Sequence, residues 1–499
     1  MIAGKRPLLA ELAGEQWDLV VVGGGITGAG VLLLAAQLGI KVLLVEKQDF
    51  AWGTSSRSSK MVHGGLRYMA QGAVRLTREA LQERERLLRE LPDLVVRQPY
   101  LFPIRKGQFP GRWPMAVVLW LYDRLAGIRD HRWMGAAELA ERVPALGREQ
   151  LRGAMCYTDA LTDDSRLVLR VLHEAAAEGA TMLNYAGVEA VTGPQGEHEV
   201  ALRDQLTGAL HTLHAKHVIN ATGAWADKLS GSAPRVRPLR GSHLLVPAAR
   251  LPVADCLTVR HPQDGRPVFV FPWQGLTCIG TTDLDHKEDL DQEPAISQRE
   301  IDYLLALVNS QFPDVHLGEA DIISTMAGVR PVISSGKGLD PSRERRDHAV
   351  WQENGIITVS GGKLTTFRVI AIDALLAAGL IDQTAHRRLL ASPRLFRQAA
   401  SVPAGLGHPL KPWPGEEQGA QAALLDWVLT HEMVVHLDDL MLRRTRFGNL
   451  LADGGDALLA AHAERICTAL GWDEQRWQQE LTRYRAILQQ SYRMPAAMG

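Results

Sequence analysis

The chain has 499 residues, of which 46% are hydrophobic and 22% charged, and its formal net charge is -1. This composition excludes a disordered, collagen-like or coiled-coil description of the whole chain. The balance of 55 basic against 56 acidic residues also argues against nucleic-acid binding, which usually needs a strongly basic domain. The length predicts two or three domains with enough core to bury a large cofactor, and any anionic ligand must be held by local arginines.

The four cysteines, Cys156, Cys256, Cys278 and Cys467, lie far apart and form no C-x-x-C pair. The spacing therefore indicates neither a disulfide framework nor a metal site, and it favours a reducing compartment. The first sixteen residues lack the apolar core of a signal peptide, and no run approaches the roughly 18 to 20 apolar residues of a spanning helix. We expect a cytoplasmic protein.

Alternating strand and helix signals open the chain. Residues 18–22 form an apolar run, glycines follow, an apolar helical stretch reaches residue 38, and a second apolar run covers 41–46. This order predicts a βαβ unit with a parallel strand pair. Further along, amphipathic helices are expected at 72–91 and 164–179, and short strands at 188–191, 198–203 and 209–213, before a buried strand at 217–220.

The middle of the chain has a different pattern. Between residues 238 and 280, short β-type runs are punctuated by proline and glycine, which indicates an antiparallel sheet inserted into the first domain. The first pattern returns with a strand at 356–359 and a helix to about 376. We therefore assign one domain to 1–95, 150–230 and 350–380, a second to 96–149 and 231–349, a linker to 381–417, and a helical C-terminal domain to 418–499.

A glycine-rich turn is the first functional signal. Gly23, Gly25 and Gly28 satisfy G-x-G-x-x-G directly after a strand and before a helix, and Glu46 ends the next strand. Bare backbone can approach a pyrophosphate there, while the acid can accept a hydrogen bond from a ribose hydroxyl. A packing turn would explain the glycines alone but not their context. The pattern predicts a dinucleotide site without separating NAD from FAD.

Three further segments lie at strand-to-helix junctions or shortly after the acid. They are the hydroxyl-rich stretch 54–60 with the glycine pair at 64–65, the turn at 221–225, and the turn at 361–366. A solvated loop or an ordinary turn is an alternative for each of them alone. Together with the first motif they suit a long cofactor that lies across the domain.

These segments resemble a known family. In chain order the strings GGGITGAG, GTSSRSSKMVHGGLRYM, NATGAWAD, GSHLLVP, GTTD, GVRP and SGGKLTTFR are similar to those of FAD-dependent glycerol-3-phosphate dehydrogenases, over about residues 17 to 375. DLMLRRTRFG at 439–448 resembles the helical cap domain of that family, in a shorter form than long members have. The resemblance implies an α/β fold: a Rossmann-type FAD-binding domain, an inserted antiparallel-sheet substrate domain and a small helical C-terminal domain.

The resemblance also implies the reaction, which is oxidation of sn-glycerol 3-phosphate to dihydroxyacetone phosphate, with hydride transfer to FAD and electrons passed to a quinone. The motifs and the resemblance together indicate these cofactor-binding residues: Gly23, Gly25, Ile26, Thr27, Gly28, Glu46, Thr54, Ser55, Ser58, Ser59, Lys60, His63, Gly64, Gly65, Leu66, Gly223, Trp225, Gly361, Gly362, Lys363, Leu364 and Thr365.

Oxidation of a secondary alcohol needs a base near the hydroxyl, and His243 in the GSH string is the candidate, with a structural histidine as the alternative. A substrate phosphate favours arginine, and the resemblance implies that Arg330, in the string GVRP, binds substrate and polarises the reacting oxygen. Lys363 could stabilise charge on the reduced flavin or contact substrate, or could simply point to water. The remaining substrate-binding candidates are Arg67, Tyr68 and, more weakly, Arg346.

A lipid-soluble acceptor would require contact with a membrane. Residues 109–125 combine tryptophans and aliphatic residues with nearby Arg105, Lys106 and Arg112, a composition that suits a helix lying on the inner face of the cytoplasmic membrane. A buried core helix explains the same residues nearly as well. A homodimer is left open, and Trp52, where small residues are expected, could narrow the approach to the flavin.

Three other functions are left open. The first is an oxidase that passes electrons to oxygen, and the second is an amine or amino-acid oxidase of the same fold, which would bind a carboxylate where we place a phosphate. The third is a flavin-binding protein without catalysis, which the presence of the arginine and histidine candidates disfavours.

Overall fold

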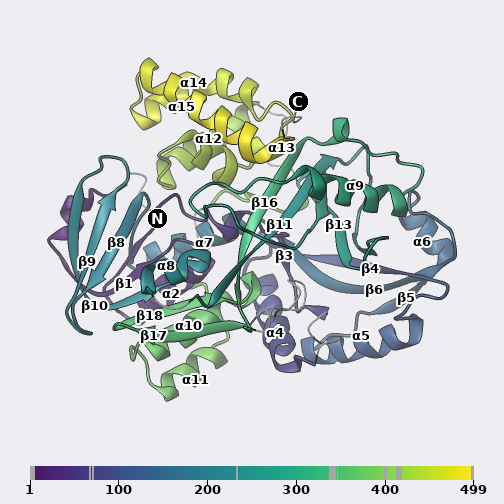
Figure 1. Ribbon diagram of the computed structural model, residues 1–499, viewed down its shortest axis with the longest axis horizontal. Helices are drawn as coiled ribbons and strands as arrows, with labels where there is room; N and C mark the ends of the chain where they lie inside the picture. Colours follow the sequence, from purple (N-terminus) through teal and green to yellow (C-terminus); the bar gives the residue numbers. More distant parts are fainter. Residues whose placement is uncertain are drawn as a thin grey trace.

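The computed structural model describes residues 6–66, 69, 72–231, 234–336, 344, 347–397, 402–411 and 418–495. Figure 1 shows two sheets side by side, with a group of helices from the end of the chain above them. Arg67, Tyr68 and Arg346 lie outside the described residues.

The first sheet carries the predicted βαβ unit. Its strand order is β17-β18-β10-β1-β2-β7, and β9 pairs with β10 and with β8. β1 runs parallel to β2 and β10, and β10 parallel to β18, so these strands end at the same edge of the sheet. The strands are β1 (Gln16–Val22), β2 (Val42–Val45), β7 (Thr181–Leu183), β8 (Ala186–Thr192), β9 (His198–Asp204), β10 (Leu210–Asn220), β17 (His348–Glu353) and β18 (Ile356–Gly361).

Burial explains the composition of these central strands. Leu19, Val20 and Val21 are 0% exposed, as a strand covered on both faces requires. The helix after β1, α2 (Ile26–Gln37), is apolar on all sides because it packs against both α7 (Asp164–Ala177) and α10 (Phe367–Ala377). A Cβ at Gly30 would lie 2.8 Å from the Phe367 ring, so glycine permits this close approach.

The second sheet has the order β15-β11-β14-β13-β12-β4-β6-β3, with β16 on β11 and β5 on β6. Its pairs are antiparallel, as expected, except that β12 runs parallel to β4. The strands are β3 (Met61–Val62), β4 (Val95–Arg105), β5 (Arg132–Gly135), β6 (Leu151–Thr162), β11 (Val236–Pro247), β12 (Cys256–Arg260), β13 (Pro267–Trp273), β14 (Leu276–Gly280), β15 (Leu284–Asp285) and β16 (Ser324–Ile333).

Two segments assigned from sequence to the first domain, β3 and β6, belong to the second sheet. β6 pairs with β4 along almost its whole length, from Val95 opposite Thr162 to Arg105 opposite Leu151. Alternation of apolar and polar residues in the sequence indicates a strand. It does not indicate the sheet, because the sheet is decided by the strand with which it pairs.

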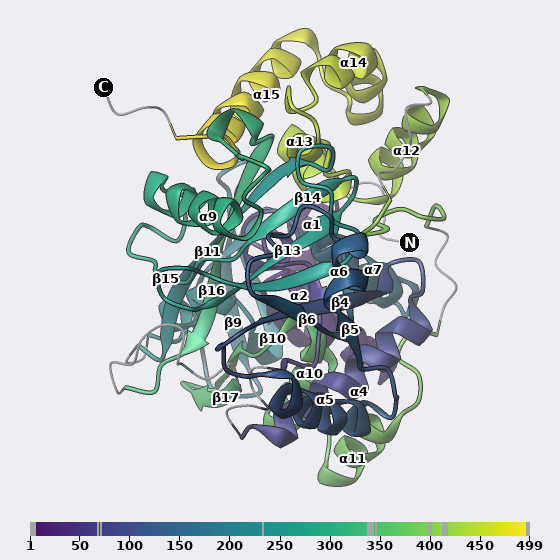
Figure 2. The same ribbon diagram turned by 90° about the vertical axis from the view of Figure 1, so that its right-hand side faces the viewer.

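Helices flank the second sheet and form the end of the chain. Figure 2 shows α4 and α5 below it and the C-terminal helices above. The helix α11 occupies part of the segment expected to be a linker. The helices outside the first layer are α1 (Leu9–Ala13), α4 (Val74–Glu90), α5 (Arg112–Ala126), α6 (Ala136–Arg142), α8 (Ala226–Ser230), α9 (Gln298–Gln311), α11 (Gln383–Ala391), α12 (Gln418–His431), α13 (Phe447–Leu450), α14 (Asp456–Leu470) and α15 (Glu474–Ile487).

Short helical turns join several of these elements. They are the 3₁₀ turns η1 (Thr54–Ser56), η2 (Gly223–Trp225), η3 (Glu319–Asp321) and η5 (Leu364–Thr366), and the π-helical turns η6 (Asp439–Arg444) and η7 (Leu488–Tyr492). The C-terminal helices share a core of their own that includes Leu425, Leu440 and Tyr484. A helical C-terminal region is thus confirmed.

Candidate active site

The glycine turn between β1 and α2 has the geometry that a dinucleotide needs. Gly23 has φ +111°, and a Cβ there would lie 2.7 Å from the carbonyl oxygen of Ala221. A Cβ at Gly28 would lie 1.9 Å from the Gly23 carbonyl oxygen. The first glycine therefore allows the turn and the last allows the helix to approach the strand, which are the two tasks expected of them.

A cavity of about 440 Å³ opens at the edge where the parallel strands end. Its walls come from the glycine turn, the end of β2, the loop after β2, β8, η2 and η5. Of the predicted cofactor-binding residues, these line it: Gly23, Gly25, Ile26, Thr27, Glu46, Thr54, Ser55, Ser58, Gly223, Trp225, Gly361, Gly362, Lys363 and Leu364.

Glu46 is held in place by two backbone donors. Its carboxylate accepts hydrogen bonds from the amides of Gly24 at 2.6 Å and Gln48 at 2.8 Å. Burial raises the pKa of this carboxyl above its ordinary value. Since the group also lines the cavity, it can still offer a lone pair to a ribose hydroxyl.

The loop after β2 forms a second wall. The Ser55 hydroxyl accepts a hydrogen bond from the Ile26 amide at 3.0 Å, which ties this loop to the start of α2. Trp52 lines the cavity, and its ring centroid lies 5.9 Å from that of Trp225. The Arg57 guanidinium lies 4.9 Å from the Trp52 ring centre. Trp52 is therefore part of the cavity wall; its effect on the approach to the flavin stays a prediction.

Other predicted cofactor residues do not line the cavity. Lys60 is 0% exposed and its ammonium group pairs with Asp164 at 2.7 Å, which indicates a structural role. Burial lowers its pKa to about 8 despite that carboxylate. The others outside the lining are Gly28, Ser59, His63, Gly64, Gly65, Leu66 and Thr365.

Part of the wall has no motif in the sequence. Ala186, Gly187, Val188 and Glu189 of β8, with Gln205 after β9, line the cavity beside Glu46. Pairing places them there, because β8 follows β7, which extends the sheet beyond β2. The other lining residues, which are absent from the predicted cofactor-binding set, are Val22, Lys47, Gln48, Gly53, Ala221, Thr222, Ala224, Lys228, Leu229, Asp291 and Pro331.

His243 and Arg330 lie on neighbouring strands. The ring Nε2 of His243 forms a hydrogen bond with the Ser59 hydroxyl at 2.9 Å, and the residue is 0% exposed. Arg330 on β16 donates to Asp283 at 3.1 Å and Thr281 at 2.9 Å. Burial, and then the charge of Arg330, holds the pKa of His243 well below its usual range, so this imidazole is neutral at pH 7. Neither side chain lines the cavity itself.

Lys363 joins the cavity to a buried polar network. Its ammonium group donates to the Gly64 carbonyl at 3.4 Å, and burial lowers its pKa to about 7. The Gly64 amide donates to the Tyr122 hydroxyl at 3.0 Å and to Asp159 at 3.3 Å. Asp159 in turn pairs with the buried Arg84 at 2.6 Å. The Gly64 peptide that Lys363 contacts is thus itself held by Tyr122 and Asp159.

Comparison with known proteins identifies the family. The sequence model for "FAD dependent oxidoreductase" matches residues 18–368, well over half of the chain. The chain belongs to this FAD-dependent oxidoreductase family. It is also 37% identical, over 374 residues, to the aerobic glycerol-3-phosphate dehydrogenase of Staphylococcus aureus; the match covers 73% of this chain and 67% of that protein.

Solved structures agree with this assignment. The FAD complex of glycerol-3-phosphate dehydrogenase from Bacillus halodurans is 27% identical, covers 98% of each chain and has a TM-score of 0.74. An L-α-glycerophosphate oxidase from Mycoplasma pneumoniae (18% identical, TM-score 0.59, 73% of this chain and 95% of that one) and a glycine oxidase from Geobacillus kaustophilus (21%, 0.54, 74% and 96%) share the fold. The Rossmann-type fold, FAD and oxidoreductase class are therefore confirmed.

The residues present fit FAD. Glycines 23, 25, 361 and 362 border the cavity, with φ of +82° and +77° at the last two, and a Cβ at Gly25 would lie 3.2 Å from the Ser55 hydroxyl oxygen. In the described ranges no group of three or more His, Cys, Asp or Glu could hold a metal ion. None of the described helices is both long and apolar enough to cross a membrane.

Proposed function

We propose that this enzyme oxidises sn-glycerol 3-phosphate to dihydroxyacetone phosphate. The observation that carries the proposal is the 98% coverage of both chains in the match to the Bacillus halodurans dehydrogenase. Lys363 lines the FAD cavity, Arg330 precedes the lining residue Pro331, and His243 is hydrogen-bonded to Ser59, which follows the lining residue Ser58. These positions beside the cavity wall support a reaction there.

The side chains can divide the chemistry between them. FAD, when bound, accepts the hydride from the substrate carbon. His243 is the proposed base: it is neutral at pH 7, and Ser59 holds its ring, so it can take the hydroxyl proton. Arg330 is the proposed phosphate ligand or oxyanion donor, because Asp283 and Thr281 orient a permanently charged guanidinium.

Lys363 is a second candidate for moving the proton. It lines the cavity, which His243 does not, and its pKa of about 7 lets it accept or release a proton near neutral pH. If it remains charged, it supplies the positive charge that a reduced flavin ring or a phosphate requires. Arg67, Tyr68 and Arg346 remain predicted substrate ligands.

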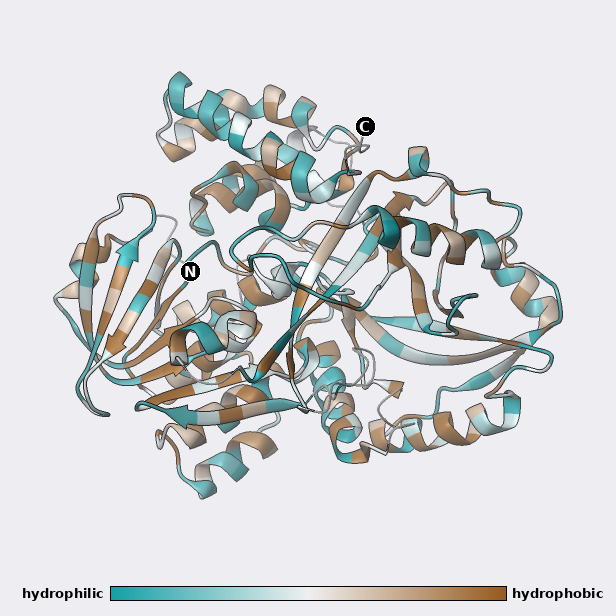
Figure 3. Ribbon diagram, in the orientation of Figure 1, coloured by the Kyte–Doolittle hydropathy of each residue, from teal (hydrophilic) through white to brown (hydrophobic). Residues whose placement is uncertain are grey.

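We further propose that α5 docks on the inner face of the cytoplasmic membrane, where a quinone takes up the electrons. Trp113, Val117 and Trp120 are 73%, 66% and 55% exposed and share one face of this helix. The opposite face is buried through Met115, Leu119 and Tyr122, so the helix is not enclosed by the core. α5 lies at the lower edge of the molecule in Figures 1 and 2, and apolar segments colour it brown in Figure 3.

Charge supports an anionic lipid surface as the partner. The Arg112 guanidinium lies 5.0 Å from the Trp113 ring centre, and that of Arg124 lies 5.6 Å from the Trp120 ring centre. Exposed tryptophans beside arginines suit the boundary between acyl chains and phosphate headgroups.

Anaerobic flavin absorbance tests the reaction directly. Purified holoenzyme is titrated with glycerol 3-phosphate, with glycerol and sarcosine as controls. Bleaching of the oxidised flavin band by the phosphate ester alone supports the proposal. Bleaching by sarcosine instead supports an amino-acid oxidase, and flavin that none of the three reduces overturns the substrate assignment. Peroxide formation in air, without reduction of a quinone analogue, would identify an oxidase.

A further inference from the structure

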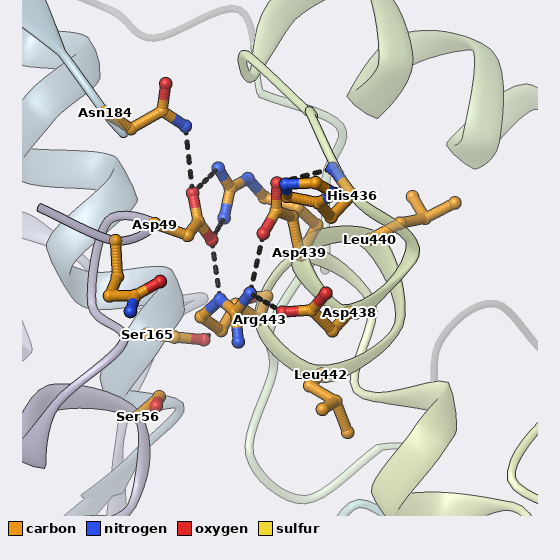
Figure 4. Close-up of polar contacts among 12 residues, drawn as sticks. Asp49, Ser56, Ser165, Asn184, His436, Asp438, Asp439, Leu440, Leu442 and Arg443 are labelled. Atoms are coloured by element: carbon orange, nitrogen blue, oxygen red, sulfur yellow. Dashed lines mark hydrogen bonds and ion pairs between the residues drawn. The ribbon is translucent and has the colours of Figure 1, made fainter. Parts of the chain in front are cut away.

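The C-terminal helical domain contacts the cofactor-binding domain through buried arginines. In Figure 4, Asp49 lies between η6 and Asn184. The Arg443 Nε donates to Asp49 at 2.6 Å, and Arg444 donates to both carboxylate oxygens of Asp49 at 2.6 and 2.7 Å. Asn184 adds a hydrogen bond at 3.1 Å. One carboxylate therefore receives donors from two arginines and an amide.

Asp49 lies where the chain leaves β2 and enters the cavity wall. It lies three positions after Glu46, the predicted acceptor for a ribose hydroxyl of the cofactor. Two residues later, the Ala51 amide donates to the Gly24 carbonyl at 3.0 Å, and Ala51 has φ +63°. A left-handed backbone is unusual for alanine and persists only where surrounding contacts impose it. The hydrogen bonds from Arg443 and Arg444 to Asp49 are among the contacts that impose this conformation.

Arg446 holds the other end of the same loop. Its guanidinium donates to the Ser56 carbonyl at 3.1 Å and to Asp163 at 2.8 Å, and it pairs with Asp164. Asp164 accepts hydrogen bonds from the Ser58 amide at 2.8 Å and hydroxyl at 2.7 Å. Ser56 and Ser58 are thus fixed from behind by a side chain more than 380 residues away in the sequence.

Between these two anchors the loop lines the FAD cavity with Trp52, Gly53, Thr54, Ser55 and Ser58. The arginines touch the rear of the loop and do not line the cavity themselves. They are 2% exposed or less, so their hydrogen bonds act in a low-dielectric environment where geometry is strongly determined.

We propose that Arg443, Arg444 and Arg446 are positioning residues for FAD, so that the C-terminal domain retains the cofactor by holding the loop of residues 49–58 in its binding shape. This assigns a function to the DLMLRRTRFG segment. The inference requires bound FAD but not the identity of the substrate.

The same interface contains a matched control. Arg166 on α7 forms a bidentate pair with Glu432 of the C-terminal domain at 2.6 and 2.8 Å. Arg166 is 3% exposed and therefore nearly as buried as Arg443, Arg444 and Arg446. Its other hydrogen bonds go to Asp163 and to the Arg444 carbonyl, neither of which lies within residues 49–58. Loss of Arg166 should weaken the attachment of the domain without directly releasing the loop.

The experiment compares Arg444→Lys and Arg446→Lys with Arg166→Lys in the full-length holoenzyme. FAD release is followed by the fluorescence of free flavin, and Tm is measured in parallel. Loss of one charge-assisted hydrogen bond predicts that FAD is released about tenfold faster from Arg444→Lys and from Arg446→Lys. Arg166→Lys should lower Tm comparably and change release less than about twofold.

Equal rates of FAD release from all three variants at matched Tm would overturn the proposal. A rate unchanged from wild type in both Arg444→Lys and Arg446→Lys would also overturn it. If Arg444→Lys or Arg446→Lys fails to fold, Asn184→Ala is measured in its place, because it removes one donor to Asp49 and leaves the arginines intact. FAD release from Asn184→Ala should also be faster than from wild type. Release is measured without substrate, so failure here is distinguishable from failure of the anaerobic titration.

Discussion

The Tyr122 hydroxyl on the buried face of α5 donates to the Asp159 carboxylate at 2.8 Å and accepts a hydrogen bond from the Gly64 amide at 3.0 Å. Its helix carries the exposed tryptophans on the other face, while the Gly64 carbonyl faces Lys363. A single side chain thus connects the outer helix to the Lys363 end of the cavity.

Tyr122→Phe should lower stability by about 1 kcal/mol and slow flavin reduction by glycerol 3-phosphate, because the Gly64 peptide loses a partner. Stopped-flow absorbance and Tm measure the two effects. Tyr100→Phe, at another buried tyrosine of the same core, is the control, because the Gly64 amide donates to Tyr122 and Asp159 and not to Tyr100. Equal reduction rates in the two variants would contradict a positioning role for Tyr122.

Gly280→Ala should displace His243. The two residues face each other in the β11–β14 pair, and a Cβ at 280 would lie 2.2 Å from the imidazole Cδ2. Overpacking of this kind costs about 1 to 3 kcal/mol, and here the moving group is the proposed base. We expect slower flavin reduction with FAD still bound. Gly318→Ala, where a Cβ meets nothing within 4 Å, should leave the rate unchanged.

The pH dependence of flavin reduction distinguishes two roles for Lys363. Burial lowers its pKa to about 7, so the side chain is charged below that pH and neutral above it. A role as base predicts a rate that rises as pH increases through 7, whereas a role as cation predicts a rate that falls. Lys363→Met should remove this inflection in either case. A profile identical to wild type would exclude both roles.

Arg330→Ala should raise KM for glycerol 3-phosphate and lower turnover while FAD remains bound, because a fixed guanidinium is lost from beside His243. Steady-state kinetics and the flavin spectrum report the two properties. Loss of FAD from this variant would place Arg330 in the cofactor site instead.

By contrast, His243→Ala should slow flavin reduction with little change in the affinity for glycerol 3-phosphate.

Replacing both Trp113 and Trp120 with serine should weaken binding to vesicles of anionic phospholipid by at least about tenfold, since two large apolar side chains no longer enter the lipid. Sedimentation with vesicles measures the effect, and flavin reduction in solution should be unaltered. Leu210→Ser, an exposed apolar residue on the other sheet, is the control. Unchanged sedimentation would exclude α5 as the docking face.

Local motifs predicted the glycine turn between β1 and α2, which the structure contains. The tight turn at Gly23 and the close approach at Gly28 are requirements that a few adjacent residues impose on their own backbone, so they are visible in sequence. The strand and helix that flank the turn follow from apolar runs. These features indicated a dinucleotide-binding fold, and the resemblance carried by the ordered motifs indicated FAD.

Tertiary structure alone decided the rest. Ala186 and Gln205 lie in the cavity wall, Lys60 forms a buried ion pair with Asp164, and Arg446 donates a hydrogen bond to the Ser56 carbonyl. Such contacts depend on which strands pair and which helix faces pack, and they involve residues without a shared motif. Periodicity likewise could not separate a surface helix from a core helix at α5, because either has an apolar face. The exposure of Trp113 and Trp120 shows that α5 lies at the surface.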